Sequence, residues 1–310
     1  MTRIRILVSA SAIALGAGLA MQSAPAIAGD VCEVNGSDAT AGTASGTNAL
    51  ACGDQSSATG AYSTAIGYNA QASGNNGTAS GYFSRATGVY SSAYGIGSRA
   101  TGNYSSAYGG FSNADGVHSS AFGILSTASG NYSTAVGGWL DLDGNGSINA
   151  NEITTASGIE SSAFGAAAQA TGSYSSAFGD DAIASGISSS AYGAHSSASI
   201  DGSTYGAFSN ASGYKSSAYG FGSTASGYTS SAYGSYSSAS GAYTSAFGFA
   251  SIATGDYSLT LGYRASDGGF TNSVALGANT TVTADDQVNV GGRTVSGLAN
   301  GSVAAGSPTR

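Results

Sequence analysis

The segment from Asp141 to Glu152 carries the densest set of metal-ligating residues in this sequence, and it reads DLDGNGSINANE. Oxygen-bearing side chains stand at its first, third, fifth and ninth positions, Gly146 provides a sharp turn at the sixth, and Glu152 offers two oxygens at the twelfth. This spacing is that of the twelve-residue calcium loop, in which the seventh residue contributes its backbone carbonyl. The predicted Ca²⁺ ligands are Asp141, Asp143, Asn145, Ser147, Asn149 and Glu152.

The loop has no partner loop and no long flanking helices. Trp139-Leu140 on one side and Ile153 to Thr155 on the other leave room for a single helical turn at most. An unpaired extracellular loop is expected to bind Ca²⁺ with a dissociation constant of about 10⁻⁴–10⁻³ M. The alternative is a solvated turn rich in Asp and Gly that binds no metal.

Cys32 and Cys52 are the only two cysteines in the chain, and they could form a covalent cross-link. In an oxidising compartment they are expected to form one intrachain disulfide that holds the N-terminal segment against the first repeat. Two alternatives stay open: a bridge between chains, or two free thiols with Cys52 filling a core position.

Nucleophilic catalysis is not predicted, although serine is abundant. A serine nucleophile needs a neighbouring base and an orienting acid. His118 and His195 occupy repeat positions that elsewhere hold Tyr or small residues, so they are expected to be surface substitutions. The glycines lie in no βαβ context that would bind a dinucleotide. The sequence predicts that the protein is not an enzyme.

All of these residues belong to a chain with a fourteen-residue period, seen in ATGNYSSAYGGFSN from Ala100 to Asn113. The period runs from about residue 44 to about residue 280, in about sixteen copies. Counting Ala100 as position one, Ala recurs at positions one and eight, Gly at three and ten, and an aromatic or aliphatic residue at nine. The Gly and Ser content disfavours helices, and glycine permits turns with positive φ. The predicted fold is all-β, a parallel β-roll or solenoid.

The strand pattern suggests which side chains face inward. Positions five, seven and nine share one face of an extended strand, and positions six and eight share the other. We expect the large residues at position nine, such as Phe122, Phe164 and Phe247, to lie inside the coil, with Val274 and Leu276 on the same face. Such a thin core favours oligomerisation, with Ala at position eight or a neighbouring Ala buried at a subunit contact.

The two ends differ from the repeats. Residues 1–28 combine Arg3 and Arg5, an apolar run and the pattern Ala26-Ile27-Ala28, which is typical of a secretory signal peptide. The alternative is a membrane anchor. Residues 29–43 form an N-terminal segment. Without the leader, six Lys or Arg remain against 16 Asp or Glu, a formal charge of −10. A net negative charge repels phosphate groups, so nucleic-acid binding is not predicted.

The repeats are interrupted twice. The unit that begins at Ala198 is one residue short and lacks glycine at position three, so we expect an altered turn there. Residues 141–155, which contain the calcium-type loop, are expected to leave the solenoid as a surface excursion.

The repeated S-[ST]-A-[YFIV]-G pattern, ending in Asn272-Ser273-Val274-Ala275-Leu276-Gly277, resembles the head repeats of YadA-type trimeric autotransporter adhesins. The resemblance covers residues 44–280, and the segment from Asp285 to Ser307, within residues 281–310, resembles the neck that follows such heads. It implies a left-handed parallel β-roll, a homotrimer, and attachment to a host extracellular-matrix protein or an abiotic surface. It also implies display on the bacterial cell surface or outer membrane, or secretion.

The chain departs from this family in two respects. No stalk heptads and no barrel-forming strands follow residue 281, so this chain is not expected to insert itself into a membrane. Position seven is mostly Ser or Thr and position nine is unusually aromatic. Rows of Tyr, Ser and Asn on a rigid scaffold suit a binding surface. The alternatives to an adhesin head are a solenoid that binds ice or another lattice, and a passive structural fibre or fragment of a longer adhesin.

Overall fold

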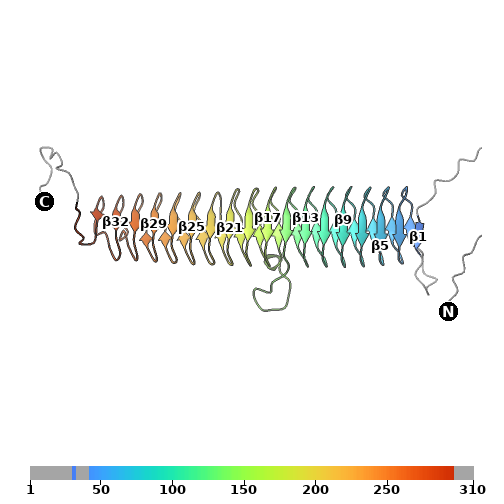
Figure 1. Cartoon of the computed structure of the whole chain (residues 1–310), viewed down its shortest axis with the longest axis horizontal. Coiled ribbons are helices and arrows are strands. Elements are labelled where there is room, and N and C mark those ends of the chain that lie inside the picture. Colours follow the sequence, from blue (N-terminus) through green and yellow to red (C-terminus); the bar gives the residue numbers. More distant parts are fainter. Residues whose placement is uncertain (1–29, 33–41, 297–310) are drawn as a thin grey trace, which may run out of the picture.

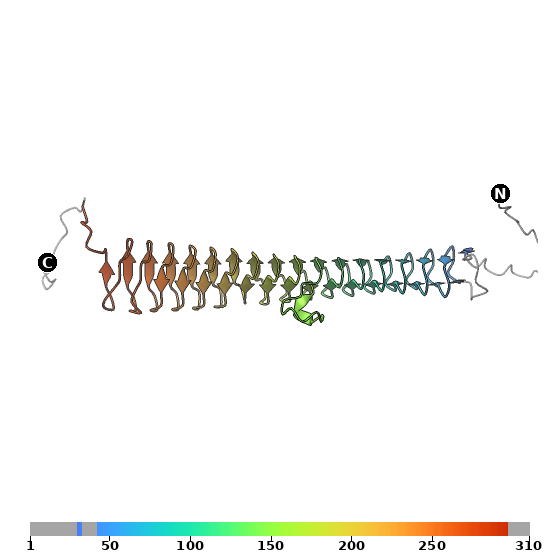
Figure 2. The same cartoon turned by 90° about the horizontal axis from the view of Figure 1, so that it is seen from below.

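The computed structural model describes residues 30–32 and 42–296, which form a long rod of stacked coils (Figure 1). The predicted signal peptide 1–28, Gly29, residues 33–41 and residues 297–310 lie outside the described residues. The rod has two parallel β-sheets, one on each side of the coil, named here sheet A and sheet B (Figure 2).

Sheet A contains eighteen strands, and most of them cover positions seven to nine of the unit. Its strands are β1 (Asp30–Cys32), β3 (Leu50–Cys52), β5 (Thr64–Ile66), β7 (Thr78–Ser80), β9 (Ser92–Tyr94), β11 (Ser106–Tyr108), β13 (Ser120–Phe122), β15 (Thr134–Val136), β17 (Ser162–Phe164), β19 (Ser176–Phe178), β21 (Ser190–Tyr192), β23 (Ser203–Tyr205), β25 (Ser217–Tyr219), β27 (Ser231–Tyr233), β29 (Ser245–Phe247), β31 (Leu259–Leu261), β32 (Val274–Leu276) and β33 (Val288–Asn289).

Sheet B contains fifteen two-residue strands at positions fourteen and one. Its strands are β2 (Thr43–Ala44), β4 (Ser57–Ala58), β6 (Gln71–Ala72), β8 (Arg85–Ala86), β10 (Arg99–Ala100), β12 (Asn113–Ala114), β14 (Thr127–Ala128), β16 (Thr155–Ala156), β18 (Gln169–Ala170), β20 (Ile183–Ala184), β22 (Ser197–Ala198), β24 (Asn210–Ala211), β26 (Thr224–Ala225), β28 (Ser238–Ala239) and β30 (Ile252–Ala253).

Strands pair in parallel with the same strand of the next coil, so that residues one period apart are partners, as in Ser106↔Ser120. The short unit is absorbed by a one-residue change of this spacing, at Ser190↔Ser203. The predicted all-β parallel solenoid is confirmed. It has about eighteen turns by the strands of sheet A, because β1 and β33 extend the ladder beyond residues 44–280. Left-handedness stays a prediction.

The core consists of small residues, and the predicted inward face is wrong. Ala at positions one and eight is buried throughout, as at Ala107, which is 0% exposed. By contrast, Phe122 is 39% exposed and Leu276 42% exposed. Phe164, Phe247 and Val274 are partly exposed as well. The two sheets lie so close together that only methyl and hydroxymethyl groups fit between them. The expectation that Ala at position eight lies at a subunit contact is therefore also wrong.

Buried hydroxyl groups close the turns of each coil from within. At position six, Ser63 Oγ donates to the Gly60 carbonyl at 2.7 Å, and at position thirteen Ser84 Oγ donates to the Gly81 carbonyl at 2.9 Å. Buried polar groups are stable in a core when they are hydrogen-bonded. The serine-rich composition thus provides core residues as well as surface residues.

The two repeated glycines have different roles. Gly at position ten adopts a positive φ, as at Gly109 with φ 134°. Gly102 at position three does not, but a Cβ there would lie 2.0 Å from the Gly116 carbonyl oxygen of the next coil. The expectation that both glycines provide positive-φ turns holds only for position ten. Positions five and twelve also have positive φ, and bulky residues occupy them, such as Tyr104 (φ 59°) and Phe111 (φ 55°).

Sheet B ends at a buried carboxylate. Asp267 stands at position one, where other units have Ala, and one extra residue in the turn that follows it makes Leu259 pair with Val274 fifteen residues later. Asp267 Oδ2 accepts hydrogen bonds from the amides of Thr254 (2.7 Å) and Gly255 (2.8 Å). In regular coils a backbone carbonyl of the next Ala accepts these two bonds. A side chain therefore completes the hydrogen bonding of the last strand.

Candidate functional site

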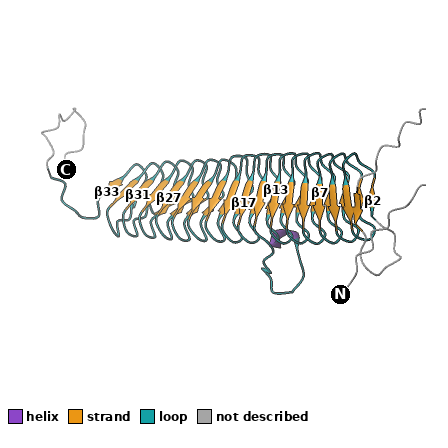
Figure 3. Cartoon of the chain, turned by 45° about the vertical axis from the view of Figure 1, so that its right-hand side comes forward, coloured by secondary structure: helices purple, strands orange, loops and turns teal. Residues whose placement is uncertain are grey.

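The inserted loop leaves the rod between β15 and β16, at the turn that joins sheet A to sheet B. Figure 1 and Figure 2 show it as a single excursion from the side of the rod. Trp139 and Ile153 form an antiparallel bridge at its base, and the Leu140 amide donates to the Glu152 carbonyl at 2.8 Å. The loop contains one 3-10 turn, η1 (Ala150–Glu152), seen in Figure 3. The predicted excursion is therefore present.

Three predicted calcium ligands converge in this loop. Asp141, Asp143 and Glu152 each offer a carboxylate oxygen, and these oxygens lie within 4.8 Å of one another. The Glu152 side chain is buried, with 0% exposure, whereas Asp143 is exposed. Charges of the same sign at this separation repel one another, and a divalent cation between them would remove that repulsion.

Backbone amides hold the first two carboxylates in place. The Gly144 and Gly146 amides donate to Asp141 Oδ1 and Oδ2 at 2.7 and 3.0 Å, and the Asn145 amide donates to Asp143 Oδ1 at 3.1 Å. Both glycines have positive φ, 72° and 71°. The sharp turn predicted at Gly146 is confirmed.

The other predicted ligands are bonded into the same network. The Ser147 amide donates to Asn145 Oδ1. Asn149 Nδ2 donates to Asp143 Oδ2 at 3.3 Å, and the Asn149 amide donates to Glu152 Oε2 at 2.8 Å. All six predicted residues thus lie in one loop that orders its own carboxylates.

The environment of Glu152 favours its charged form. The hydrogen bond from the Asn149 amide is the main cause that lowers the pKa of this carboxyl, and the Leu142 and Asp143 amides act in the same direction. Burial and the neighbouring Asp141 oppose this effect on the pKa. An ionised carboxylate is the form that ligates a metal.

Away from the loop, the outer face of sheet A carries a row of aromatic rings at position nine. Rings stack from coil to coil without interruption over seven coils, with centroid separations of 4.7–5.0 Å. The row consists of Phe164, Phe178, Tyr192, Tyr205, Tyr219, Tyr233 and Phe247. Burial is the main cause that raises the pKa of Tyr219, and Tyr233 and Tyr205 add to it. This face is therefore partly desolvated within a single chain.

A second row follows position five at one turn of the coil. Tyr90, Tyr104, His118 and Tyr132 stack at 4.7–5.2 Å. His118 is a member of this row, as the repeat pattern predicts. His195 lies at the opposite turn, where its Nδ1 is 3.0 Å from Asp181 Oδ2.

The cysteines are brought to neighbouring strands. β1 pairs in parallel with β3, and Cys32 and Cys52 are Cα partners. Adjacent strands lie about 4.8 Å apart, a spacing that falls in the Cα separation of disulfides. The intrachain disulfide stays a prediction, and the mass of the unreduced chain tests it.

The prediction from the sequence did not include the charged group on sheet B, in which Arg85 and Arg99 lie on adjacent strands and Asp115 follows the next strand. The repeated tripeptide Arg-Ala-Thr, at 85–87 and 99–101, was the available signal. It also missed Asp267, for which the extra residue in the last unit was the signal.

The stacked coils and their outward rows define a repetitive parallel β-solenoid. The sequence family described as the YadA head domain repeat (2 copies) matches residues 44–70, 58–84, 72–97, 86–112, 114–138, 156–182, 211–237, 218–244, 239–265 and 271–286. These matches cover more than half of the chain, which belongs to this family.

Among solved structures, the collagen-binding domain of the Yersinia adhesin YadA is similar to this chain, with a TM-score of 0.36 and 23% sequence identity. The similarity covers 56% of this chain and 90% of that one. The family assignment rests on the repeats and not on this superposition. No curated protein sequence matched the chain. Within the described residues, no helix is long and apolar enough to cross a membrane.

Proposed function

We propose that this protein is the head of a trimeric adhesin that is exported and displayed on the bacterial surface or released from it. In this proposal it attaches to a host extracellular-matrix protein or an abiotic surface by binding, without catalysis. The observation that carries the trimer is the uninterrupted row of seven stacked rings at position nine, and the repetition of the coils gives each copy further outward rows that stay available for attachment. A rigid repetitive surface binds through many equal contacts, which raises avidity.

The outer face of sheet A is the proposed contact between the three copies. Its aromatic row is partly exposed in one chain, and monomeric proteins rarely expose a contiguous apolar patch of this kind. The core of the regular coils consists of Ala, Ser and Thr side chains, so each coil buries little apolar area. Packing the rows of three chains against one another supplies the missing apolar burial.

Light scattering on the mature chain tests the trimer. We expect a mass three times that of one chain. An Asp at Tyr219, in the middle of the row, places a charge in the contact and should yield monomers or unfolded chains. An Asp at the exposed Tyr62, outside this row, is the matched control and should leave the trimer intact. A folded wild-type monomer at micromolar concentration contradicts the proposal.

Attachment is tested separately, with purified trimer on immobilised collagen, fibronectin, laminin, glass and polystyrene. We expect saturable binding to at least one of these surfaces that exceeds binding of the monomeric Tyr219→Asp variant by more than tenfold, because avidity requires several copies. Equal binding by trimer and monomer, or none to any surface, contradicts an adhesive role.

We further propose that the inserted loop binds Ca²⁺ through Asp141, Asp143 and Glu152, with Asn145, Ser147 and Asn149 completing the site. The support is the match of all six positions to the calcium-loop pattern together with the convergence of the three carboxylates. Bound calcium would keep the excursion ordered against the rod. The expected dissociation constant is about 10⁻⁴–10⁻³ M.

Calorimetry with Ca²⁺ tests this site on three proteins: the wild type, Glu152→Gln and Glu160→Gln. Glu152→Gln keeps the size of the side chain, and we expect at least a tenfold loss of affinity. Glu160→Gln changes the net charge equally but lies outside the loop, so its affinity should equal that of the wild type. No heat from the wild type at millimolar Ca²⁺, or equal heat from all three, excludes the site.

A further inference from the structure

The outer face of sheet B is flat and almost uncharged. Its outward side chains come from positions fourteen and two, and most of them are Ser, Thr, Asn or Gln. Over all fifteen strands of this sheet, only Arg85, Arg99 and Asp115 are charged at these positions. They lie on three consecutive coils: Arg85 is in β8, Arg99 is in β10, and Asp115 directly follows β12. The concentration of charge at one place on a neutral face suggests a specific contact.

The two arginines form a repeated module. Arg85 and Arg99 are Cα partners on adjacent strands, so their guanidinium groups project from the same face about 4.8 Å apart at the backbone. Each is followed by Ala and then Thr, which places Thr87 and Thr101 beside one another as well. Both arginines are exposed. Two like charges at this separation repel each other, and a bound anion would relieve the repulsion.

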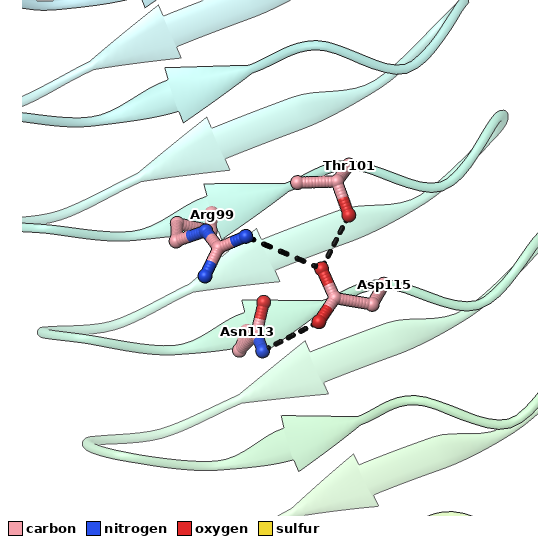
Figure 4. Close-up of polar contacts among 4 residues, drawn as sticks. All are labelled: Arg99, Thr101, Asn113 and Asp115. Carbon is pink, nitrogen blue, oxygen red and sulfur yellow. Dashed lines mark hydrogen bonds and ion pairs between the residues drawn. The ribbon is translucent and has the colours of Figure 1, made fainter.

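The neighbouring carboxylate of Asp115 forms an ion pair with Arg99 and leaves the charge of Arg85 without a counterpart among the described residues. Asp115 Oδ1 lies 3.9 Å from Arg99 Nη2, and this is the single Arg–carboxylate pair in the described part of the chain (Figure 4). Asp115 also accepts hydrogen bonds from Thr101 Oγ1 and, at 2.7 Å, from Asn113 Nδ2. The Arg99 side chain keeps 49% exposure. The guanidinium group of Arg85 and the part of the Arg99 guanidinium group that does not face Asp115 are therefore open to a ligand.

We propose that Arg85 and Arg99 bind the sulfate or carboxylate group of an acidic polysaccharide that lies across sheet B. Arginine pairs with such groups through two parallel hydrogen bonds. The surrounding Ser, Thr, Gln and Asn side chains match the hydroxyl groups of a sugar chain, and a flat face suits an extended polymer. The chain carries a formal charge of −8 before any processing, so it repels polyanions elsewhere and this pair is the point that attracts one.

The proposal deepens the adhesive function and rests on it, because it names a class of ligand for the face that the trimer leaves outside. If sheet A lies at the contact between copies, sheet B faces outward. Each trimer then presents three Arg85–Arg99 pairs, and a long polysaccharide reaches more than one of them.

Surface plasmon resonance of the trimer with heparin, hyaluronate and neutral dextran tests the proposal. Heparin carries sulfate groups, hyaluronate carries only carboxylates, and dextran carries no charge. We expect heparin or hyaluronate to bind, with weakening as salt rises, and dextran not to bind. The acidic polysaccharide that binds identifies which anionic group is recognised. Failure of both acidic polysaccharides to bind overturns the proposal.

Three variants separate this site from general charge effects. Arg85→Gln with Arg99→Gln should lower affinity about a hundredfold, about tenfold for each charged hydrogen-bonding group. Lys215→Gln with Arg264→Gln removes the same charge at the turns and should have no effect. Asp115→Asn removes the nearby negative charge and should raise affinity several-fold. Equal losses in the two double variants, or weaker binding by Asp115→Asn, contradict the site.

The experiments distinguish a failure of the arginine site from a failure of the proposed adhesive function. Loss of polysaccharide binding with retained attachment to matrix proteins or plastic rejects only the arginine site. Loss of attachment to every surface by the wild-type trimer rejects the adhesive function itself.

Discussion

The coils and the inserted loop satisfy their polar groups in opposite ways. In the coils, most backbone amides donate to a backbone carbonyl of an adjacent coil or of their own turn, and the hydrogen-bonded buried serine hydroxyls donate to glycine carbonyls of their own coil. In the loop, the amides donate to carboxylates of the same loop, as Gly144 does to Asp141. The backbone hydrogen bonding of a coil is therefore completed by the adjacent coils. The backbone hydrogen bonding of the loop is completed by its own carboxylates, so the order of the loop depends on a cation or proton that neutralises them.

This difference predicts where the protein tolerates amino-acid substitutions. A residue in the interior of a coil lies between the backbones of two adjacent coils, so an added atom forces these coils apart. A residue in the loop meets solvent, so its effect remains local. Five substitutions or conditions test this contrast, beginning with the largest expected effect.

Gly102→Ala should destabilise the rod most. The new Cβ would lie 2.0 Å from the Gly116 carbonyl oxygen, so two coils must separate. We expect a loss of at least about 3 kcal/mol in unfolding free energy, at the upper end for an overpacked site. Gly110→Ala in the same coil is the control, because no atom lies within 4 Å of its Cβ position. Chemical denaturation measures both, and equal losses would contradict close stacking at position three.

Asp267→Ala should have the next largest effect, at the C-terminal end of sheet B. Removing the carboxylate leaves the amides of Thr254 and Gly255 without an acceptor, a cost of about 1–3 kcal/mol for each buried group. We expect hydrogen exchange to accelerate in residues 252–270 while residues 86–128 keep their protection. Asp256→Asn is the control, because it removes a nearby carboxylate but keeps an oxygen that can accept from the Ala242 amide. Uniform acceleration along the rod would show that this end is not a separate unit.

Replacing two buried serines by alanine should have different effects on the free energy of unfolding. Ser91 Oγ donates to the Gly88 carbonyl at 2.7 Å, so Ser91→Ala should cost about 1 kcal/mol. Ser105 Oγ has no hydrogen-bond partner in the described structure, so Ser105→Ala should be neutral or should stabilise by up to about 1 kcal/mol. Thermal unfolding of the two variants checks the order. A larger loss for Ser105→Ala would mean that its hydroxyl is bonded in solution.

Acid should loosen the loop before it affects the coils. The folded-state pKa of Glu152 is lowered from the ordinary value of 4.5, so its ionised form adds stability above pH 4.5 that is lost as the pH falls through the lowered value. The fluorescence of Trp139, the single Trp of the chain, should report this change. Far-ultraviolet circular dichroism reports the coils and should stay constant over the same range. In Glu152→Gln the Trp139 transition should be absent.

Removal of the loop should have the smallest effect on the rod. Deleting residues 139–152 removes one period and joins Gly138 to Ile153, which restores the fourteen-residue spacing to Thr154. Ile153 would then occupy position twelve, where positive φ is required, so Ile153→Asn should accompany the deletion. We expect the melting temperature to change by less than about 4 °C. A folded deletion variant that still binds Ca²⁺ would place the metal elsewhere, and an unfolded one would show that the loop is part of the rod.

The amino-acid sequence by itself determined the period, the β-structure and the inserted loop. A repeat of fourteen residues with Gly and Ser throughout excludes helices, and parallel stacking of equal units follows from it. The positions of the six predicted loop ligands were also readable, because a calcium-type loop is a local structure in which all ligands lie within twelve residues.

Only the tertiary structure decided which face of each strand is inside. Hydrophobicity pointed to Phe122 and Phe247, but the gap between the two sheets admits only side chains the size of Ala107, so the large residues lie outside. The packing role of Gly102 depends on the next coil in the same way. The pairing of Arg85 with Arg99 depends on the register between coils, because residues a whole period apart become neighbours only when the strands stack.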